Sequence, residues 1–195
     1  MGKLIIKAIS NSEDLELVAA VDEAGTENAG VDAGLFAGDG ELGVDIVGGE
    51  ELEETLEETD PDILVDFTVA EAAVNNVKTA AKRGVSVVVG TTGFSDKQRE
   101  ELKKSIEKHQ ISAVIASNMS LGVNVFFKLV EEVAQKLDDY DMELIEAHHN
   151  KKVDSPSGTA LTAAEIAAEA SDKDLEKVAR FGRPKGEIGE RSKEE

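Results

Sequence analysis

The sequence has 195 residues, a formal net charge of -20 and no cysteine. With 41% hydrophobic residues, a chain of this length can bury the core of one ordinary domain or of two small ones. The lack of cysteine excludes disulfides and thiolate metal sites, and the apolar runs are far shorter than the ~18 to 20 residues that span a bilayer. We therefore expect a soluble cytoplasmic protein.

The negative charge is concentrated in the first part of the chain. Twenty acidic residues and no Lys or Arg lie between Lys7 and Lys78, whereas acids and bases balance in the rest. Such a surface repels phosphate backbones and anionic lipids, so we expect neither a nucleic-acid partner nor a membrane partner. The excess charge is also typical of a solvated surface in a salt-rich cytoplasm.

Short β-rich runs alternate with longer segments of helical period, which is typical of βαβ units and predicts an α/β fold with a parallel sheet. Gly84 is a predicted helix stop, and Ser95 with Gln98 forms a predicted capping box. The predicted helices are 4–9, 50–58, 69–83, 95–109 and 123–137. The predicted strands are 15–21, 44–47, 62–67, 85–89, 111–116 and 142–147.

The first predicted strand leads into Asp22, twenty residues after Gly2. In a dinucleotide-binding βαβ unit, a glycine-rich turn precedes the helix, and an acid about 20 residues further on holds the ribose hydroxyls. An arbitrary helix followed by a strand gives the same pattern. Both interpretations of Asp22 therefore stay open on this evidence alone.

Two predicted loops carry small and hydroxyl residues at strand ends. "VVVGTTGF" places Gly90, Thr91 and Thr92 after one strand, and "ASNMS", from Ala116 to Ser120, follows the next. Ligands bind at the carboxyl ends of the strands in open α/β sheets, although an ordinary β-to-α turn has a similar composition. Two such loops on neighbouring strands favour a shared ligand crevice.

The segment "EAHHNKKVDSPSGTA", from Glu146 to Ala160, contains two of the three histidines. On a strand the rings of His148 and His149 point to opposite sides, so only one of them faces a pocket. A histidine near an ammonium group suits a site that protonates a substrate, and the helix N-terminus after "SPSGT" suits a carboxylate or phosphate. The alternatives are a surface histidine pair and a metal site, and a metal is disfavoured because the rings diverge and no third ligand is evident.

Four segments together resemble the dihydrodipicolinate reductase family, whose substrate is now written as 4-hydroxy-tetrahydrodipicolinate. They are "DFTVAEAAVNNV", "VVGTTGF", "ASNMSLGVNV" and "EAHHNKKVDSPSGTA". The likeness runs from Met1 to about Gly189. It implies reduction of that substrate with NADH or NADPH in the diaminopimelate route to lysine, by a cytoplasmic homotetramer with a Rossmann-type domain and a substrate domain.

The resemblance also implies roles for individual substrate-site residues. His148 matches the family's acid/base histidine, and Lys152 matches its substrate-side proton donor. His149, Gly158 and Thr159 match the groups that hold the carboxylates of a small dicarboxylate substrate.

For the cofactor, the resemblance matches Asp22 to the ribose-binding acid and the two loops to the nicotinamide site. The loop residues are Gly90, Thr91, Thr92, Ala116, Ser117, Asn118 and Met119. Asp22 is followed by Glu23, and no cationic side chain occurs from Ala8 to Val77. Because a 2'-phosphate needs a basic partner there, we predict a preference for NADH over NADPH.

The expected domains are a dinucleotide-binding domain at 1–119 and a substrate-binding domain at 120–195. Compared with the family pattern, Met1 and Gly2 correspond to the end of the glycine-rich turn, and the chain stops at "GEIGERSKEE". We therefore expect the first strand of the Rossmann-type sheet and the last part of the substrate domain to be missing. This predicts an incomplete gene model or a chain that is not a competent enzyme as written. The alternatives are a catalytically inactive binding or assembly module and another dehydrogenase with the same cofactor fold.

Overall fold

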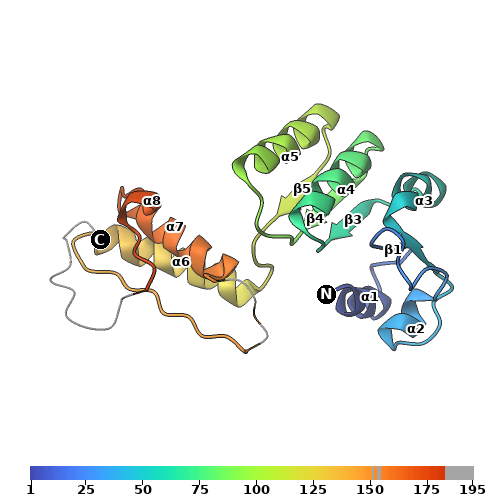
Figure 1. Ribbon diagram of the computed structural model, residues 1–195, viewed down its shortest axis with the longest axis horizontal. Coiled ribbons are helices and arrows are strands. Elements are labelled where there is room, and N and C mark those ends of the chain that lie inside the picture. The colour runs from blue at the N-terminus through green and yellow to red at the C-terminus, as the bar shows by residue number, and fades with distance from the viewer. Residues whose placement is uncertain (151, 153–154, 183–195) are drawn as a thin grey trace. The chain divides into compact units, whose positions relative to one another are not determined.

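The computed structural model describes residues 1–150, 152 and 155–182 and divides into two compact units, Met1–Ala116 (unit 1) and Ser117–Glu195 (unit 2). Figure 1 labels the elements along the chain. The helices of unit 1 are α1 (Gly2–Ser10), α2 (Ala33–Ala37), the 3-10 turn η1 (Gly49–Glu51), α3 (Leu52–Thr59), α4 (Ala70–Lys82) and α5 (Asp96–His109). Its strands are β1 (Ala20–Asp22), β2 (Ile46–Gly48), β3 (Ile63–Asp66), β4 (Ser86–Val89) and β5 (Ala113–Ile115). The described helices of unit 2 are α6 (Leu121–Lys136), α7 (Gly158–Ala170) and α8 (Leu175–Val178).

The strands of unit 1 form two parallel sheets, which confirms the predicted α/β class. β1 pairs with β2, and in the larger sheet β4 lies between β3 and β5. The register of the larger sheet places Leu64 opposite Val87, and Val87 opposite Ala113. Because these strands are parallel, the loops that follow β3, β4 and β5 emerge at one edge of the sheet, where ligands bind in such folds.

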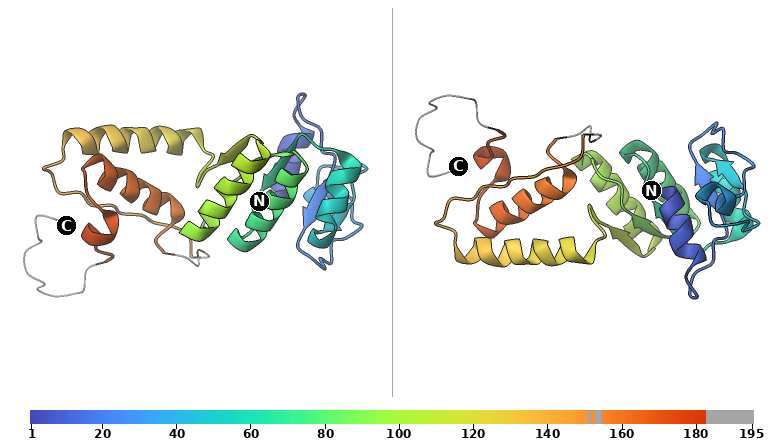
Figure 2. Two further views of the ribbon diagram at one scale, coloured as in Figure 1. Left: turned by 90° about the horizontal axis from the view of Figure 1, so that it is seen from above. Right: turned by 90° about the horizontal axis from the view of Figure 1, so that it is seen from below.

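The main core of unit 1 lies between the larger sheet and its helices. α4 and α5 pack side by side on it (Figures 1 and 2). The buried residues of α4 are Ala73, Val74, Val77, Ala80 and Ala81. All of these except Ala81 pack with Val87 and Val89 of β4 in one hydrophobic cluster. Since a buried aliphatic side chain contributes about 1.5–3 kcal/mol, this cluster holds the strand ends in place.

Two predicted helix signals are confirmed. Gly84 follows α4 with a φ of 78°, and its N–H donates to the Ala81 carbonyl at 3.0 Å. A residue with a side chain is strained in this left-handed region, so glycine fits the stop. At the start of α5, Ser95 and Gln98 form the reciprocal capping box, with the Gln98 N–H 3.3 Å from Ser95 Oγ.

A smaller core joins α1, α2 and β2. It buries Ile6, Ala33, Ala37 and Ile46. Asp32 begins α2, and its carboxylate accepts hydrogen bonds from the backbone N–H groups of Leu35, Leu42, Gly43 and Val44. These hydrogen bonds, with that of Leu35 the largest cause, lower the pKa of Asp32 below its ordinary value.

Unit 2 is built around the pair α6 and α7, which lie side by side in both views of Figure 2. The pair buries Phe127 and Ala134 of α6. On α7 the buried residues are the small side chains Ala160, Ala163 and Ala168, which allow the helices to approach closely. Leu129 and Val133 of α6 remain more than half exposed and line an apolar groove beside the connection from α6 to α7.

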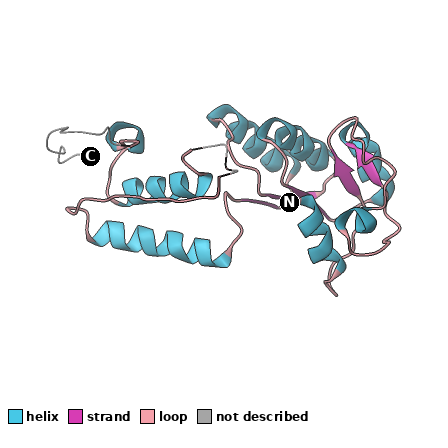
Figure 3. Cartoon of the chain, turned by 60° about the horizontal axis from the view of Figure 1, so that its bottom comes forward, coloured by secondary structure: helices cyan, strands magenta, loops and turns pink. Residues whose placement is uncertain are grey.

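Two predicted strands are wrong in whole or in part, and one short helix was not predicted. Residues 142–147 are irregular, and Figure 3 shows the connection between α6 and α7 as loop. A strand needs a neighbour for its backbone groups, and unit 2 has no strand among its described residues. The predicted strand at 15–21 is reduced to β1, Ala20–Asp22, because only these residues pair with β2. Helix α2 was not predicted, since five residues are too few to show a helical period.

None of the described helices is long and apolar enough to cross a membrane.

Candidate active site

Asp66 organises the edge of the larger sheet where the first predicted cofactor loop begins. It ends β3 and is only 3% exposed. Its Oδ1 accepts from the Thr68 N–H at 2.9 Å and from the hydroxyls of Thr68 and Thr91 at 2.7 and 3.1 Å, and Oδ2 accepts from Asn76 Nδ2 at 2.8 Å. Thr91 is therefore fixed to the neighbouring strand. Because its single hydroxyl proton is shared between Asp66 and the Thr68 carbonyl, the Thr91 oxygen keeps lone pairs that can accept.

Gly90 lies where two backbones and an aromatic ring meet. Its N–H donates to the Asp66 carbonyl at 2.9 Å, and a Cβ at this position would overlap the ring of Phe67. The glycine is thus required by close packing at the end of β4. Thr92, the next predicted residue, is exposed. Ala116, from the second loop, donates its N–H to the Val89 carbonyl at 3.1 Å, so both loops begin at the same edge of the sheet.

Asp22 lies at the end of β1, and its own loop surrounds its carboxylate. Oδ1 accepts from the Glu23 N–H at 2.9 Å, and Oδ2 accepts from Thr26 Oγ1 at 3.0 Å and Asn28 Nδ2 at 2.9 Å. The hydrogen bond from Asn28 is the largest cause that lowers the pKa of Asp22, so the group stays ionised at neutral pH. A carboxylate has about four acceptor positions, so one of them is left for a ligand hydroxyl.

In unit 2 the second predicted loop contacts the start of α7. Asn118 Nδ2 donates to Thr159 Oγ1 at 3.2 Å, and the hydroxyls of Ser117 and Thr162 are 3.1 Å apart. Met119 is 40% exposed. The structure therefore brings Asn118, a predicted cofactor residue, into contact with Thr159, a predicted substrate residue, and it places Ser117 against Thr162 further along the same helix.

The N-terminus of α7 presents free amides. Ser157 is the N-cap, and its Oγ accepts from the Ala160 N–H at 3.0 Å. The N–H groups of Gly158 and Thr159 precede any intrahelical acceptor, as in every helix, and both residues are half-buried. The positive end of the helix dipole and two open donors suit a carboxylate.

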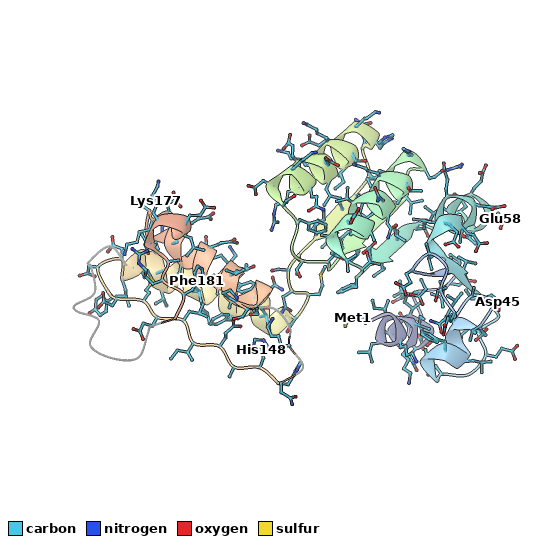
Figure 4. The ribbon with its side chains drawn as sticks, in the orientation of Figure 1. Met1, Asp45, Glu58, His148, Lys177 and Phe181 are labelled. Atoms are coloured by element: carbon cyan, nitrogen blue, oxygen red, sulfur yellow. The ribbon has the colours of Figure 1, made fainter. Side chains whose placement is uncertain are left out.

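The histidine segment meets this helix through Glu146. Glu146 Oε1 accepts from the Ser157 N–H at 2.9 Å, and its Oε2 lies 3.4 Å from His148 Nδ1. Hydrogen bonds from Ser157 are the largest cause that lowers the pKa of Glu146, and the charges of His148 and of the half-buried Lys152 lower it further. The side chain of His149 is exposed. Figure 4 labels His148 on the connection between α6 and α7. An imidazole, an ammonium group and an anion-binding helix end thus lie within one short segment, a set that can bind carboxylates and transfer a proton.

Three residues of these clusters were not predicted as site residues, namely Glu146, Asp66 and Ser157. Signals for them exist: Glu146 precedes His148 by two residues, and Asp66 closes the apolar run "ILV". Among the described residues, no group of three or more His, Asp or Glu side chains is arranged to hold a metal ion.

Both parts of the chain match one family. Residues 1–119 match the family described as "Dihydrodipicolinate reductase, N-terminus", and residues 122–195 match "Dihydrodipicolinate reductase, C-terminus". The chain belongs to the dihydrodipicolinate reductase family. The resemblance inferred from the four sequence segments is thereby confirmed.

Relatives named 4-hydroxy-tetrahydrodipicolinate reductase align with the whole chain. The protein of Methanobrevibacter smithii is 54% identical over 195 residues, and that of Methanothermobacter thermautotrophicus is 50% identical. In both cases the alignment covers 100% of this chain and 71% of the relative. The chain therefore spans about seven tenths of the length of these relatives.

Two solved structures are also similar. A dipicolinate-bound dihydrodipicolinate reductase from Paenisporosarcina sp. TG-14 superposes with a TM-score of 0.67 at 26% identity, covering 93% of this chain and 64% of that protein. An amine dehydrogenase from Mycobacterium smegmatis superposes with a TM-score of 0.51 at 22% identity, covering 60% of this chain and 36% of that one. The second likeness concerns the fold alone.

Proposed function

We propose that this protein is an NAD(P)H-dependent reductase of 4-hydroxy-tetrahydrodipicolinate in the diaminopimelate route to lysine. The observation that carries the proposal is the segment from Glu146 to Thr159, which joins His148, Lys152 and the open N-terminus of α7. Relatives of about 50% identity that align along the whole chain bear the name of this reductase.

Unit 2 supplies the groups that would bind a small dicarboxylate substrate. The N–H groups of Gly158 and Thr159 can each donate to a carboxylate oxygen, and Thr159 Oγ1 is held by Asn118. His149 and Lys152 add positive charge or donors for the second carboxylate. The relative from Paenisporosarcina was solved with dipicolinate, which is a dicarboxylate of this class.

His148 and Lys152 are the proposed proton donors. His148 Nδ1 lies 3.4 Å from Glu146 Oε2, and the charge of Lys152 is close enough to contribute to the lowered pKa of Glu146. A proton donor close to the atom that becomes protonated contributes about 10² to 10⁴ in rate. In this site the protein orients the substrate and transfers the proton at the His148 ring or the Lys152 ammonium group.

The edge of the larger sheet fits the reactive end of a nicotinamide cofactor. When bound, that cofactor supplies the hydride for the reduction. Gly90, Thr91, Thr92 and the loop from Ala116 to Met119 would hold the ring. The Gly90 N–H and the Thr91 hydroxyl both bond to Asp66, so the start of the first loop is fixed in place. Asp22 would accept from one ribose hydroxyl with its remaining acceptor position.

NADH is the proposed preferred cofactor. The ionised Asp22 and the neighbouring Glu23 repel a 2'-phosphate, and no Lys or Arg lies between Lys7 and Lys78. The preference is expected to be about 5- to 150-fold in kcat/KM, or roughly 1–3 kcal/mol. High salt should narrow it because screening weakens the repulsion. A preference for NADPH at low salt would contradict this part of the proposal.

The family resemblance supports a homotetramer located in the cytoplasm. Sedimentation equilibrium of the purified protein tests the first of these inferences, and fractionation of the source cells tests the second. A protein that sediments as a monomer at all concentrations would contradict the tetramer.

Three measurements test the reductase proposal. Calorimetry with dipicolinate and fluorescence titration with NADH measure the two ligands separately, and NADH oxidation in the presence of substrate measures turnover. We expect Thr159→Ala to weaken the binding of dipicolinate and to leave the binding of NADH unchanged. A folded protein that binds neither ligand would contradict the proposal and favour an inactive module.

A further inference from the structure

Glu146 is a carboxylate of the described site with one oxygen that accepts a hydrogen bond and one that accepts none among the described residues. Oε1 accepts from the Ser157 N–H at 2.9 Å. Oε2 is buried and has no hydrogen-bond partner among the described residues, although His148 Nδ1 lies 3.4 Å away. A buried carboxylate oxygen without a donor is costly, so a donor aimed at it is strongly favoured.

The ring of His148 can supply that donor in only one of its neutral forms. A neutral imidazole carries its proton on Nδ1 or on Nε2, and the other nitrogen is an acceptor. An ionised carboxylate accepts and cannot donate, so it favours the form with the proton on Nδ1. The hydrogen bonds from Ser157 lower the pKa of Glu146, and the charge of His148 lowers it further, which keeps the carboxylate ionised at neutral pH.

We infer that Glu146 is a positioning residue that holds His148 as the Nδ1–H tautomer and thereby leaves Nε2 as the atom that exchanges a proton with the substrate. The inference rests on the proposed function for the role of Nε2. The Glu146 side chain is 25% exposed and the His148 side chain is 39% exposed, so the less exposed carboxylate can orient the more accessible ring.

A purely structural role for Glu146 is the competing explanation. Its Oε1 joins the histidine segment to the cap of α7, and that contact alone would hold the segment against the helix. The two roles use different oxygens. Glu146→Gln separates them, because the amide keeps one oxygen for the Ser157 N–H and places a donor, in place of an acceptor, opposite His148 Nδ1.

The experiment is ¹⁵N NMR of the histidine rings at a pH at which they are neutral, with the His148 signals identified by their loss in His148→Gln. The wild-type protein should show His148 mainly as Nδ1–H, the minor form of histidine in water. Glu146→Gln should show it mainly as Nε2–H. Glu165→Gln, the same chemical change at an exposed position of α7, should match the wild type.

An Nε2–H ring in the wild type, or the same tautomer in the wild type and Glu146→Gln, would overturn the inference. The Ser157 amide signal reports whether the contact between Glu146 and the α7 cap survives in Glu146→Gln. If that contact is lost, the tautomer of His148 in the wild type alone decides whether the inference holds.

In turnover assays Glu146→Gln should lower kcat by about 10²-fold or more with the Kd for NADH unchanged. A variant with wild-type kcat would also overturn the inference. The NMR result does not depend on turnover. If the protein shows the expected tautomer but has no reductase activity, the proposed function is contradicted and the Glu146–His148 pairing is not.

Discussion

Asp66 in unit 1 and Glu146 in unit 2 are both shielded carboxylates at predicted ligand loops, but their hydrogen bonds differ. Asp66 accepts hydrogen bonds from four groups of its own unit, so both of its carboxylate oxygens have a partner. Glu146 has one oxygen committed to Ser157 and one that faces a histidine without a described hydrogen bond. The first carboxylate is used to fix the backbone, and the second is arranged to act on a group that reacts.

This difference extends to the surroundings of the two residues. At the sheet edge, Gly90 and Thr91 are already held by the protein before any ligand arrives. At the start of α7, the N–H groups of Gly158 and Thr159 have no acceptor within the helix. Changes in unit 1 should therefore act on stability first, and changes in unit 2 should act on chemistry first.

The largest effect is expected at the reacting groups of unit 2. His148→Gln and Lys152→Ala should each lower turnover by roughly two to four orders of magnitude, because each removes a proton donor. The Kd for NADH should not change, since neither residue belongs to the predicted cofactor loops. Steady-state kinetics with a parallel NADH titration measure both. Near-normal turnover in both variants would show that these residues are not part of the mechanism. It would also contradict the expectation that changes in unit 2 act on chemistry first.

The next effect is expected at Asp66. Asp66→Ala leaves the Thr68, Thr91 and Asn76 donors without their acceptor in a buried site, which should cost about 2–4 kcal/mol in the free energy of unfolding of unit 1. Hydrogen exchange of the β3 and β4 amides measures this locally. Asp62→Ala, at an exposed acid beside the other end of β3, is the matched control and should change little. Equal exchange rates in both variants would show that the Asp66 cluster is not structural.

The sequence predicted the parts of this picture that depend on local patterns. The Ser95 box, the Gly84 stop and the helix that begins after "SPS" all follow from rules that act within a few residues. The prediction of a strand at 142–147 was wrong because a strand forms only beside another strand, and the pattern of one segment cannot show such a neighbour. The Asp66–Thr91 contact was also out of reach, since it joins residues 25 positions apart through the parallel register.

A smaller effect is expected at Gly90, where the comparison can be tested through packing. Gly90→Ala places a Cβ against the Phe67 ring and should cost about 1–3 kcal/mol through overpacking. Combining it with Phe67→Leu should recover part of that loss, because the smaller side chain opens the space. Gly122→Ala on α6, where an added Cβ meets only Ser120 Oγ at 3.8 Å, should stabilise its helix slightly. Urea unfolding followed by NMR of each unit measures these changes, and a double variant no more stable than Gly90→Ala would contradict the proposed clash.

The smallest effect is expected from the pH dependence of a fixed carboxylate in unit 1. Backbone donors lower the pKa of Asp32 below its ordinary value of 3.8. A lowered pKa in the folded state means that Asp32 stabilises unit 1 above about that value, and that this contribution is lost as the pH falls through the lower folded-state pKa. Asp32→Asn should therefore be less stable than the wild type at neutral pH, and the difference should shrink in acid. Asp14→Asn, an exposed acid, provides the same chemical change and should show no such trend. If the stability of the wild type relative to Asp32→Asn instead grew as the pH fell, the protonated Asp32 side chain would be the form that caps α2. The contrast between fixed and reactive carboxylates would then not depend on charge.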